Sequence, residues 1–278
     1  METHSERIKS DHVSLFFIFD VHEGSANFAE DEFLKSVAHI KSVAKKRDVV
    51  TILGGDMIEA INVDDKRFSP TSLSPKYKLR DLKDLSRKQA DAFLENIDPI
   101  RDTIVAALVG NHEETNIKYN HFDVYDYYCD ALDCKKLGYA GIFNLFLASS
   151  PKNPHRKQIR IGLTHGHGGG GFREGYALNN CMDTFRFWRC DINIMGHVHK
   201  LEYAKYPYVT TNNNGKLIGR VAHYGIGGCF LKTYVEGNRA YFEGKKGPLS
   251  QIGFLQFDID LTAVGYKIEG IKHEFDSV

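Results

Sequence analysis

The 278-residue sequence has no excess of charge, no long apolar run and no paired cysteine motif. Its 36 basic and 36 acidic side chains cancel, so the whole molecule lacks the positive field that attracts nucleic acid. The longest apolar stretch, residues 13–19, contains Ser14 and is far too short to span a membrane. The five cysteines include no Cys-x-x-Cys pair and leave one over, which argues against structural disulfides.

Linkers and targeting signals are missing as well. No Pro/Ser-rich stretch and no repeat divides the chain, so we expect residues 1–278 to form a single domain. The polar residues 1–6 do not resemble a signal peptide. We therefore expect a cytoplasmic protein with no membrane partner.

What the sequence does contain is five short segments with metal-ligand side chains. They are Asp20-Val21-His22, Gly55-Asp56-Met57-Ile58-Glu59, Gly110-Asn111-His112-Glu113, His165-Gly166-His167 and Gly196-His197-Val198-His199. Each follows an apolar run typical of a buried strand, at residues 16–19, 49–53, 104–109, 159–163 and 192–195. All five are therefore expected at the carboxyl ends of strands, where open α/β sheets bind their ligands. Glycines at 54, 55, 110, 166 and 196 indicate sharp exits from these strands.

These side chains predict a site for two metal ions and hydrolytic rather than redox chemistry. Asp, Asn and His bind hard and borderline divalent cations, and no cysteine lies in the five segments. Two ions about 3.5 to 4 Å apart need a bridging ligand, and a carboxylate bridges best, so Asp56 is the candidate bridge. His112 directly follows Asn111, so we expect its imidazole beside the metals, within reach of a phosphate and able to protonate a leaving oxygen.

In type and order, the five segments resemble the motifs of the calcineurin-like metallophosphoesterase superfamily, over residues 20–199. Details are most similar to small phage and bacterial phosphoesterases and, more distantly, to the nuclease subunit of double-strand-break repair complexes. The resemblance implies an α/β fold, a four-layer αββα sandwich of two mixed sheets flanked by helices. It also implies two divalent metal ions, with manganese favoured over iron, zinc or nickel, and a metal-bound hydroxide that attacks phosphorus.

The resemblance further assigns the ligands to two metal sites that share Asp56. Asp20, His22 and His199 complete one site, and Asn111, His165 and His197 complete the other. The sequence departs from the family pattern at three positions. Phe19 stands where a small residue often precedes the first Asp, and Glu59 and Glu113 stand where many members carry Asp. We expect both glutamates to orient ligand imidazoles from behind.

Other patterns predict the surrounding elements. Apolar stripes predict helices over residues 28–46, 81–98 and about 121–132. Beyond His199 the sequence pattern becomes typical of strands. It predicts a hairpin over 206–211 and 216–224 and two further strands at 253–261 and 264–275.

Two basic loops are candidates for substrate binding. Residues 66–80 carry five basic and no acidic side chains, and Arg67, Lys76 and Lys78 are the expected phosphate contacts; the alternative is a solvated loop. Arg173 follows the glycines at 168–171 and could act as a moving phosphate clamp. Residues 152–157 are also basic and are interpreted as a hairpin tip.

Three functions fit this pattern. The leading one is a phosphodiesterase or nuclease that acts on DNA or another nucleotide ester. The second is a phosphomonoesterase for a small phosphorylated molecule or a protein, because the same metal core serves both reactions. The third, a scaffold without catalysis, is disfavoured because every expected ligand and His112 are present.

Overall fold

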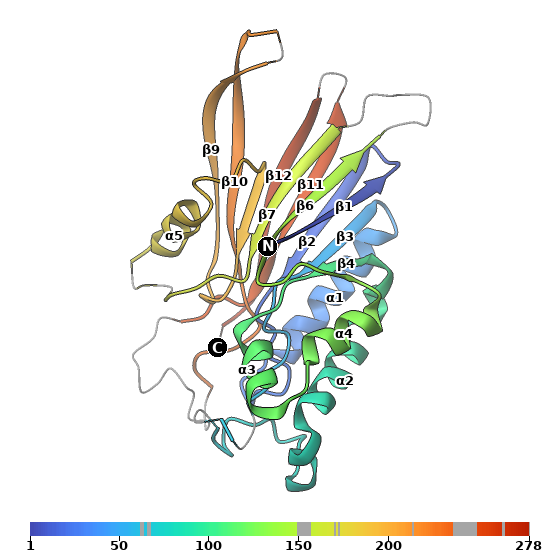
Figure 1. Cartoon of the computed structure of the whole chain (residues 1–278), viewed down its shortest axis with the longest axis vertical. Coiled ribbons are helices and arrows are strands. Elements are labelled where there is room, and N and C mark those ends of the chain that lie inside the picture. The colour runs from blue at the N-terminus through green and yellow to red at the C-terminus, as the bar shows by residue number, and fades with distance from the viewer. Residues whose placement is uncertain are drawn as a thin grey trace.

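Two mixed sheets of six strands each pack face to face, with helices outside them (Figure 1). This is seen in a computed structural model that describes residues 1–278 apart from 62–63, 66–67, 149–156, 170, 172, 213, 236–248, 263–264 and 278. The sandwich of two mixed sheets expected from the motifs is confirmed.

Sheet I has the strand order β12-β11-β2-β3-β4-β5. Its strands are β2 (His12–Ile18), β3 (Asp48–Leu53), β4 (Ile104–Ala107), β5 (Lys135–Lys136), β11 (Gly253–Thr262) and β12 (Gly265–Glu274). The strands from β2 to β5 are parallel, while β11 is antiparallel to both β2 and β12.

Sheet II has the strand order β1-β6-β7-β8-β10-β9. Its strands are β1 (Glu2–Ile8), β6 (Ala140–Leu147), β7 (Lys157–Thr164), β8 (Ile192–Met195), β9 (Leu201–Thr211) and β10 (Leu217–Gly227). The central strands β7, β8 and β10 are parallel, and β9 pairs antiparallel with β10 as the expected hairpin. The basic tip predicted at 152–157 lies between β6 and β7, almost wholly outside the described residues.

The main apolar layer lies between the sheets and explains the uninterrupted apolar runs of the sequence. Leu15 and Phe17 of β2 face Ile161 and Leu163 of β7 in this layer, and all four are fully buried. The alternate residues of β2, Phe16 and Ile18, point the other way and pack under the helices. Both faces of β2 are therefore buried, so apolar and polar residues do not alternate along this strand in the sequence.

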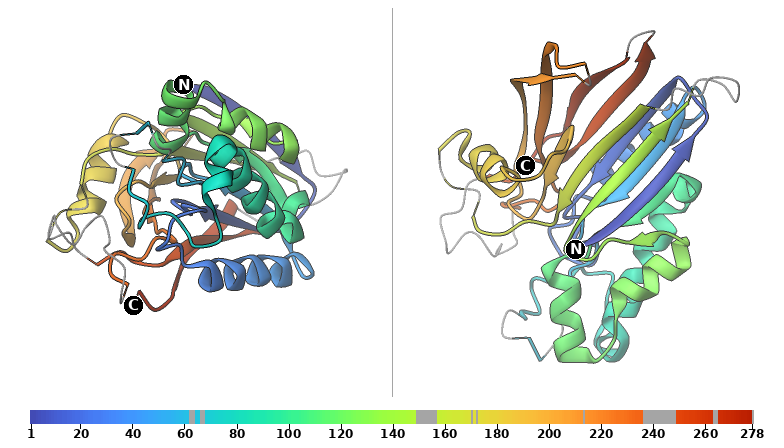
Figure 2. Two further views of the ribbon diagram at one scale, coloured as in Figure 1. Left: turned by 90° about the horizontal axis from the view of Figure 1, so that it is seen from below. Right: turned by 45° about the horizontal axis from the view of Figure 1, so that its top comes forward.

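Three helices cover the outer face of sheet I (Figure 2). They are α1 (Glu30–Ala44), α2 (Leu85–Ile97) and α4 (Val124–Leu132), and they confirm the three predicted helices. Short 3₁₀ turns, η1 (Leu79–Asp84) and η2 (Asp98–Thr103), flank α2. No helix in the described residues is both long and apolar enough to cross a bilayer.

Sheet II is covered more sparsely. Its outer face carries α5 (Tyr176–Thr184), whose Ala177 and Cys181 pack on Met195 and Ile226. The apolar patterns do not predict α5, α3 (Asn111–Asn120) or β1. Edge strand β1 is largely polar, and α3 begins inside the third motif with little amphipathic character, so neither has the periodicity that marks an element.

Candidate metal centre

The five motif loops meet at one edge of the sandwich. Asp20, Asp56 and Asn111 follow β2, β3 and β4 of sheet I, and His165 and His197 follow β7 and β8 of sheet II. The loops are tied to one another: the amide of His197 donates to Oδ2 of Asp20 at 2.9 Å, and the amide of Asp20 donates to the carbonyl of Gly55 at 3.1 Å. Sequence segments far apart thus form one polar cluster.

The backbone at this edge is held in an unusual conformation. Five of the expected ligands have left-handed backbone: Asp20, His22, Asp56, His197 and His199, with φ of 50°, 55°, 56°, 69° and 52°. Such a residue costs about 1–3 kcal/mol and persists only where surrounding contacts enforce it. The concentration of these residues in the motif loops indicates that side-chain placement, and not local stability, determined their conformation.

Glycines allow the loops to approach each other, but not all for the expected reason. Gly55 and Gly166 have positive φ, of 90° and 103°, as sharp exits require. Gly110 does not; a Cβ there would lie 2.2 Å from Oδ1 of Asp56. The prediction of special backbone at Gly54, Gly110 and Gly196 is therefore wrong, because close packing explains these positions.

Phe19, the bulky residue directly before Asp20, is accommodated by the close approach of three glycines. A Cβ on Gly54, Gly196 or Gly227 would lie 2.0, 2.1 or 2.3 Å from its ring. The ring is fully buried between the sheets directly before Asp20. The missing side chains of the glycines thus make room for the bulky residue without displacing Asp20.

One cluster of ligand atoms contains Asp20, His22 and His199, the set assigned above to one metal site. Their ligand atoms lie within 4.8 Å of one another. Nε2 of His22 is 3.3 Å from Nε2 of His199, which is itself 3.5 Å from Oδ1 of Asp20. Oδ1 of Asp20 is buried and accepts no hydrogen bond from the described residues.

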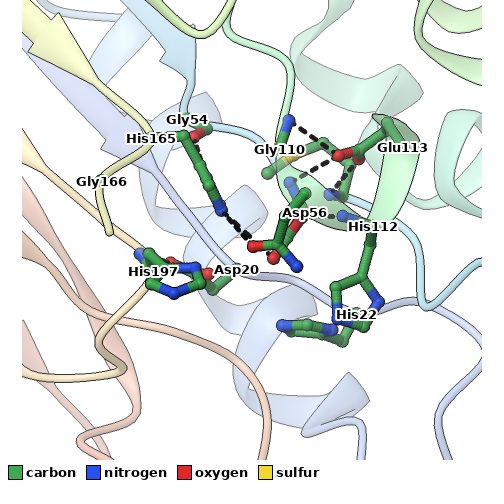
Figure 3. A network of polar contacts seen from close by, with 12 residues as sticks. Asp20, His22, Gly54, Asp56, Gly110, His112, Glu113, His165, Gly166 and His197 are labelled. Carbon is green, nitrogen blue, oxygen red and sulfur yellow. Dashed lines mark hydrogen bonds and ion pairs between the residues drawn. The ribbon is translucent and has the colours of Figure 1, made fainter. Parts of the chain in front are cut away.

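A second cluster contains Asp56, His165 and His197. Figure 3 shows Asp56 between His165 and His112, with His22 beyond His112. Nε2 of His165 is 3.2 Å from Oδ2 of Asp56 and 3.1 Å from Oδ1 of Asn111. The side chains expected to bind metal thus lie together at this edge, and a further, overlapping cluster joins His22 to Glu59 and His112.

Hydrogen bonds fix which nitrogen each of three histidines presents to the centre. Nδ1 of His22 donates to the Glu59 carboxylate at 2.9 Å, and Nδ1 of His165 donates to the Gly54 carbonyl at 2.9 Å. Nδ1 of His112 donates to the Glu59 carbonyl at 2.5 Å. Because Nδ1 carries the proton in each neutral ring, Nε2 is left with its lone pair, the form in which imidazole binds a cation.

The two glutamates of the motifs have different roles. Glu59 orients the imidazole of His22 as expected. The expectation for Glu113 is not met in its described hydrogen bonds, because its carboxylate accepts from the backbone amides of Asp56, Met57 and Gly110 at 2.9, 2.7 and 2.9 Å. Glu113 thus caps α3 and holds the loop of Asp56, and burial together with the charge of Asp56 raises its pKa to about 7.

The electrostatic field at this edge favours cations. Burial alone would raise the pKa of Asp56, but the neighbouring His165 and His112 hold it well below its usual range. Burial alone would lower the pKa of His165, yet Asp56 and Asp20 raise it to about 10. Two buried carboxylates therefore create a site that demands positive charge.

Among the described residues, the basic side chains expected to bind substrate are engaged in ion pairs or exposed. Lys76 forms ion pairs with Glu23 and, at 3.7 Å, with Glu30. Lys78 is exposed, and its amide donates to Oδ2 of Asp81 at 2.8 Å. Arg173 is exposed in the turn before α5, and Arg67 lies outside the described residues.

Sequence reasoning missed two residues around the centre. Glu23, directly after His22, is fully buried and also accepts from the Tyr77 hydroxyl and the Asn96 amide, each at 3.2 Å, so it fastens the loop before α2 to the first motif. Tyr139 lies edge-on to His165 and donates to the Gly166 carbonyl at 2.6 Å. Glu23 could have been found from its position directly after the first motif, whereas no sequence pattern indicates that Tyr139 lies beside the centre.

Neither a protein-family profile nor a curated protein sequence matches the chain. Among solved structures it is similar to a conserved uncharacterized protein, a predicted phosphoesterase, from Streptococcus pneumoniae TIGR4, with 12% identity, a TM-score of 0.34, and coverage of 94% of this chain and 98% of the other. It is also similar to a Vps29 double mutant from Entamoeba histolytica (13%, 0.36, 94% and 99%). A third similar structure is Vacuolar Protein Sorting 29 from Cryptosporidium parvum (11%, 0.35, 96% and 100%). At these TM-scores the likeness adds no weight to a function.

Proposed function

We propose that the chain is a phosphoesterase that works with two divalent ions, manganese being favoured, bound between Asp20, His22 and His199 on one side and Asn111, His165 and His197 on the other. The observation that carries this proposal is the meeting of these side chains from five strand ends, with Asp56 clustered with His165 and His197 and interacting electrostatically with Asp20 and His22. A carboxylate in that place has two oxygens to share between neighbouring ions.

The donor set supports a pair of cations on two grounds. Nε2 atoms of His22 and His199 face each other at 3.3 Å, and one of them, on His22, has its Nδ1 proton directed away toward Glu59. Oδ1 of Asp20 is buried, and Nε2 of His199, at 3.5 Å, is too far away for a good hydrogen bond, so this carboxylate oxygen is poorly satisfied by the described chain. A divalent ion would satisfy the nitrogens and the oxygen at once.

His112 is the residue proposed to act on the substrate. Its amide donates to Oδ1 of Asp56 at 2.8 Å, and its Nδ1 donates to the Glu59 carbonyl, so the ring is fixed with Nε2 toward the centre. Bound divalent ions would supply a more acidic attacking water and neutralise charge that develops on the phosphate oxygens. His112 would contact the phosphate through Nε2 and, when protonated, give its proton to the leaving oxygen.

A diester of DNA or of another nucleotide remains the preferred substrate class. The phosphomonoester alternative is favoured by one observation: Lys76, a main cation of the expected substrate loop, is engaged with Glu23 and Glu30. The completeness of the ligand set, with His112 in place, supports an enzyme over a scaffold without catalysis.

A substrate panel tests this proposal. Purified protein is stripped with a chelator and reloaded with manganese, iron, zinc or nickel, and metal content is measured beside hydrolysis of bis-p-nitrophenyl phosphate, p-nitrophenyl phosphate and labelled single- and double-stranded DNA. We expect two ions per chain and preferential diester cleavage with manganese. Preference for p-nitrophenyl phosphate would select the monoesterase, and metal binding without any hydrolysis would reject the enzyme.

A further inference from the structure

The outer face of sheet II carries an unusual set of exposed side chains. Beside α5 and on the β9–β10 hairpin lie the exposed Arg186, Phe187, Tyr206, Tyr208 and Arg220 and the half-buried Trp188, here called the arginine-aromatic face. Phe187 is 85% exposed, Tyr206 52% and Tyr208 39%. A soluble chain rarely leaves three such rings in water without use.

Contacts link several of these residues across β9, β10 and α5. On β10, Gly225 and Gly227 face the core, because a Cβ on either would meet Leu255 or Phe19, so Tyr224, which precedes Gly225, points to the opposite side of the sheet. Tyr224 lies edge-on to Tyr206, with ring centroids 6.5 Å apart, and Tyr224 and Trp188 both pack on the cluster under α5. Tyr208 is two residues beyond Tyr206 on β9 and pairs with Arg220 of β10. The hairpin that carries them extends past the rest of the sandwich (Figure 1).

The positive charge of this surface is not neutralised by ion pairs. Arg186 stands over the ring of Phe187, 5.1 Å from its centroid, and Arg186 and Arg220 form none of the ion pairs found in the described chain. Two acids of the neighbouring segments accept hydrogen bonds from neutral groups and form none of the ion pairs found in the described chain. The carboxylate of Glu202 accepts from the Leu178 amide at 3.2 Å, and that of Asp191 accepts from the Tyr266 hydroxyl at 2.9 Å.

We propose that the arginine-aromatic face binds single-stranded nucleic acid, with the rings stacking on bases and the arginines contacting phosphates. Exposed aromatic side chains interleaved with free guanidinium groups match the two components of a single strand, since each base has a π-face and each linkage has a charge. Duplex DNA has its bases stacked internally, so it cannot use the rings. This inference goes beyond the proposed phosphoesterase and does not require bound metal.

The chain contains one tryptophan, the half-buried Trp188 next to Phe187, so intrinsic tryptophan fluorescence comes from the edge of this face. We would titrate metal-free protein in chelator with oligo(dT), and with a duplex of equal length, at several salt concentrations. Oligo(dT) should quench Trp188, and its affinity should fall as salt rises because phosphate contacts release counterions. The duplex should bind at least about tenfold more weakly, as expected if stacking contributes.

Matched variants localise the binding. Tyr208→Ala with Arg220→Ala, both exposed on the hairpin, should weaken oligo(dT) binding by about tenfold or more. Lys41→Ala with Lys45→Ala removes two exposed charges from the helical side and should leave binding within about twofold. Circular dichroism and hydrolysis of bis-p-nitrophenyl phosphate check that both double variants are folded.

Several outcomes would overturn the proposal. They are absence of quenching, equal binding of the duplex, equal losses in the two double variants, or sedimentation showing that the hairpin variant instead dissociates a dimer. The result is separable from the fate of the catalytic proposal, because Asp56→Asn protein in chelator should bind oligo(dT) like the parent chain. An inactive enzyme with intact quenching would reject only the phosphoesterase.

Discussion

Two buried histidines in different regions of the molecule respond to burial in opposite ways. His165 lies at the loop edge between the sheets, and Asp56 and Asp20 override the effect of burial and raise its pKa to about 10. His223 lies within β10, where burial and Lys205 lower its pKa to about 4, against a small opposing effect of Asp191. The comparison shows that burial alone does not make a metal site. At the loop edge, the buried carboxylates favour positive charge among the imidazoles, as the proposed metal centre requires.

The neighbouring hydrogen bonds show the same contrast. His165 uses Nδ1 on a backbone carbonyl and presents Nε2 to Asp56 and Asn111. His223 uses Nδ1 on the Tyr203 hydroxyl, at 2.7 Å, and is only 4% exposed. One ring is thus oriented toward the candidate ligands Asp56 and Asn111, while the other is a hydrogen-bonded core residue.

The largest loss of activity is expected when the carboxylate beside His165 is neutralised. Asp56→Asn keeps the shape but removes the charge that both proposed ions share, so both should be lost and hydrolysis should fall to background. Metal analysis of the purified variant checks this directly. Two ions retained at unchanged affinity would reject Asp56 as the bridge.

A smaller effect is expected at His112, which shares the edge but contributes no proposed ligand atom. His112→Ala should lower turnover by roughly 10² to 10⁴ if it acts in proton transfer, with metal content near that of the parent chain. His112→Gln is the matched variant, since it retains a polar side chain but cannot donate a titrating proton. Loss of metal from both would instead identify His112 as a ligand.

A third effect concerns the loop before α2, where two lysines of similar sequence context differ in surroundings. Lys76 pairs with the fully buried Glu23, whereas Lys78 is exposed. Lys76→Ala leaves that carboxylate without its cation and should lower the free energy of unfolding by about 1–3 kcal/mol. Lys78→Ala should leave stability within about 0.5 kcal/mol.

Denaturant unfolding measures this difference, and DNA cleavage at several salt concentrations measures the remaining role in substrate binding. If Lys78→Ala flattens the salt dependence while hydrolysis of bis-p-nitrophenyl phosphate is unchanged, the substrate role of the loop is supported. If Lys76→Ala proves as stable as the parent chain, the ion pair between Lys76 and Glu23 does not contribute to holding this loop.

How far the sequence predicts this molecule depends on whether the information is local. Strand ends, the three amphipathic helices and the ligand set follow from short patterns, since apolar runs and adjacent polar residues are contiguous in the chain. The contacts of Glu113 and the glycine neighbours of Phe19 depend on loops that meet only after folding. The ion pair that engages Lys76 depends on Glu23, more than fifty residues earlier, so a count of basic residues in one segment could not reveal it.

The smallest expected effect tests the other histidine of the comparison. His223 has a folded pKa of about 4, below the value of about 6.5 for an unfolded chain, so between these pH values only the unfolded state binds the proton. Stability should therefore be greatest above pH 6.5 and should decline as pH falls toward 4, with a contribution from this residue of at most about 3 kcal/mol.

His223→Gln removes the titrating group but keeps a polar side chain for the Tyr203 hydroxyl. The variant should be less stable than the parent chain at neutral pH, and the gap should narrow steadily in acid. Denaturant unfolding in metal-free buffer at pH 7.5, 6 and 4.5 measures the gap. A gap that stays constant across the three pH values would show that His223 is protonated equally in the folded and unfolded chains, and would remove burial as the reason for its difference from His165.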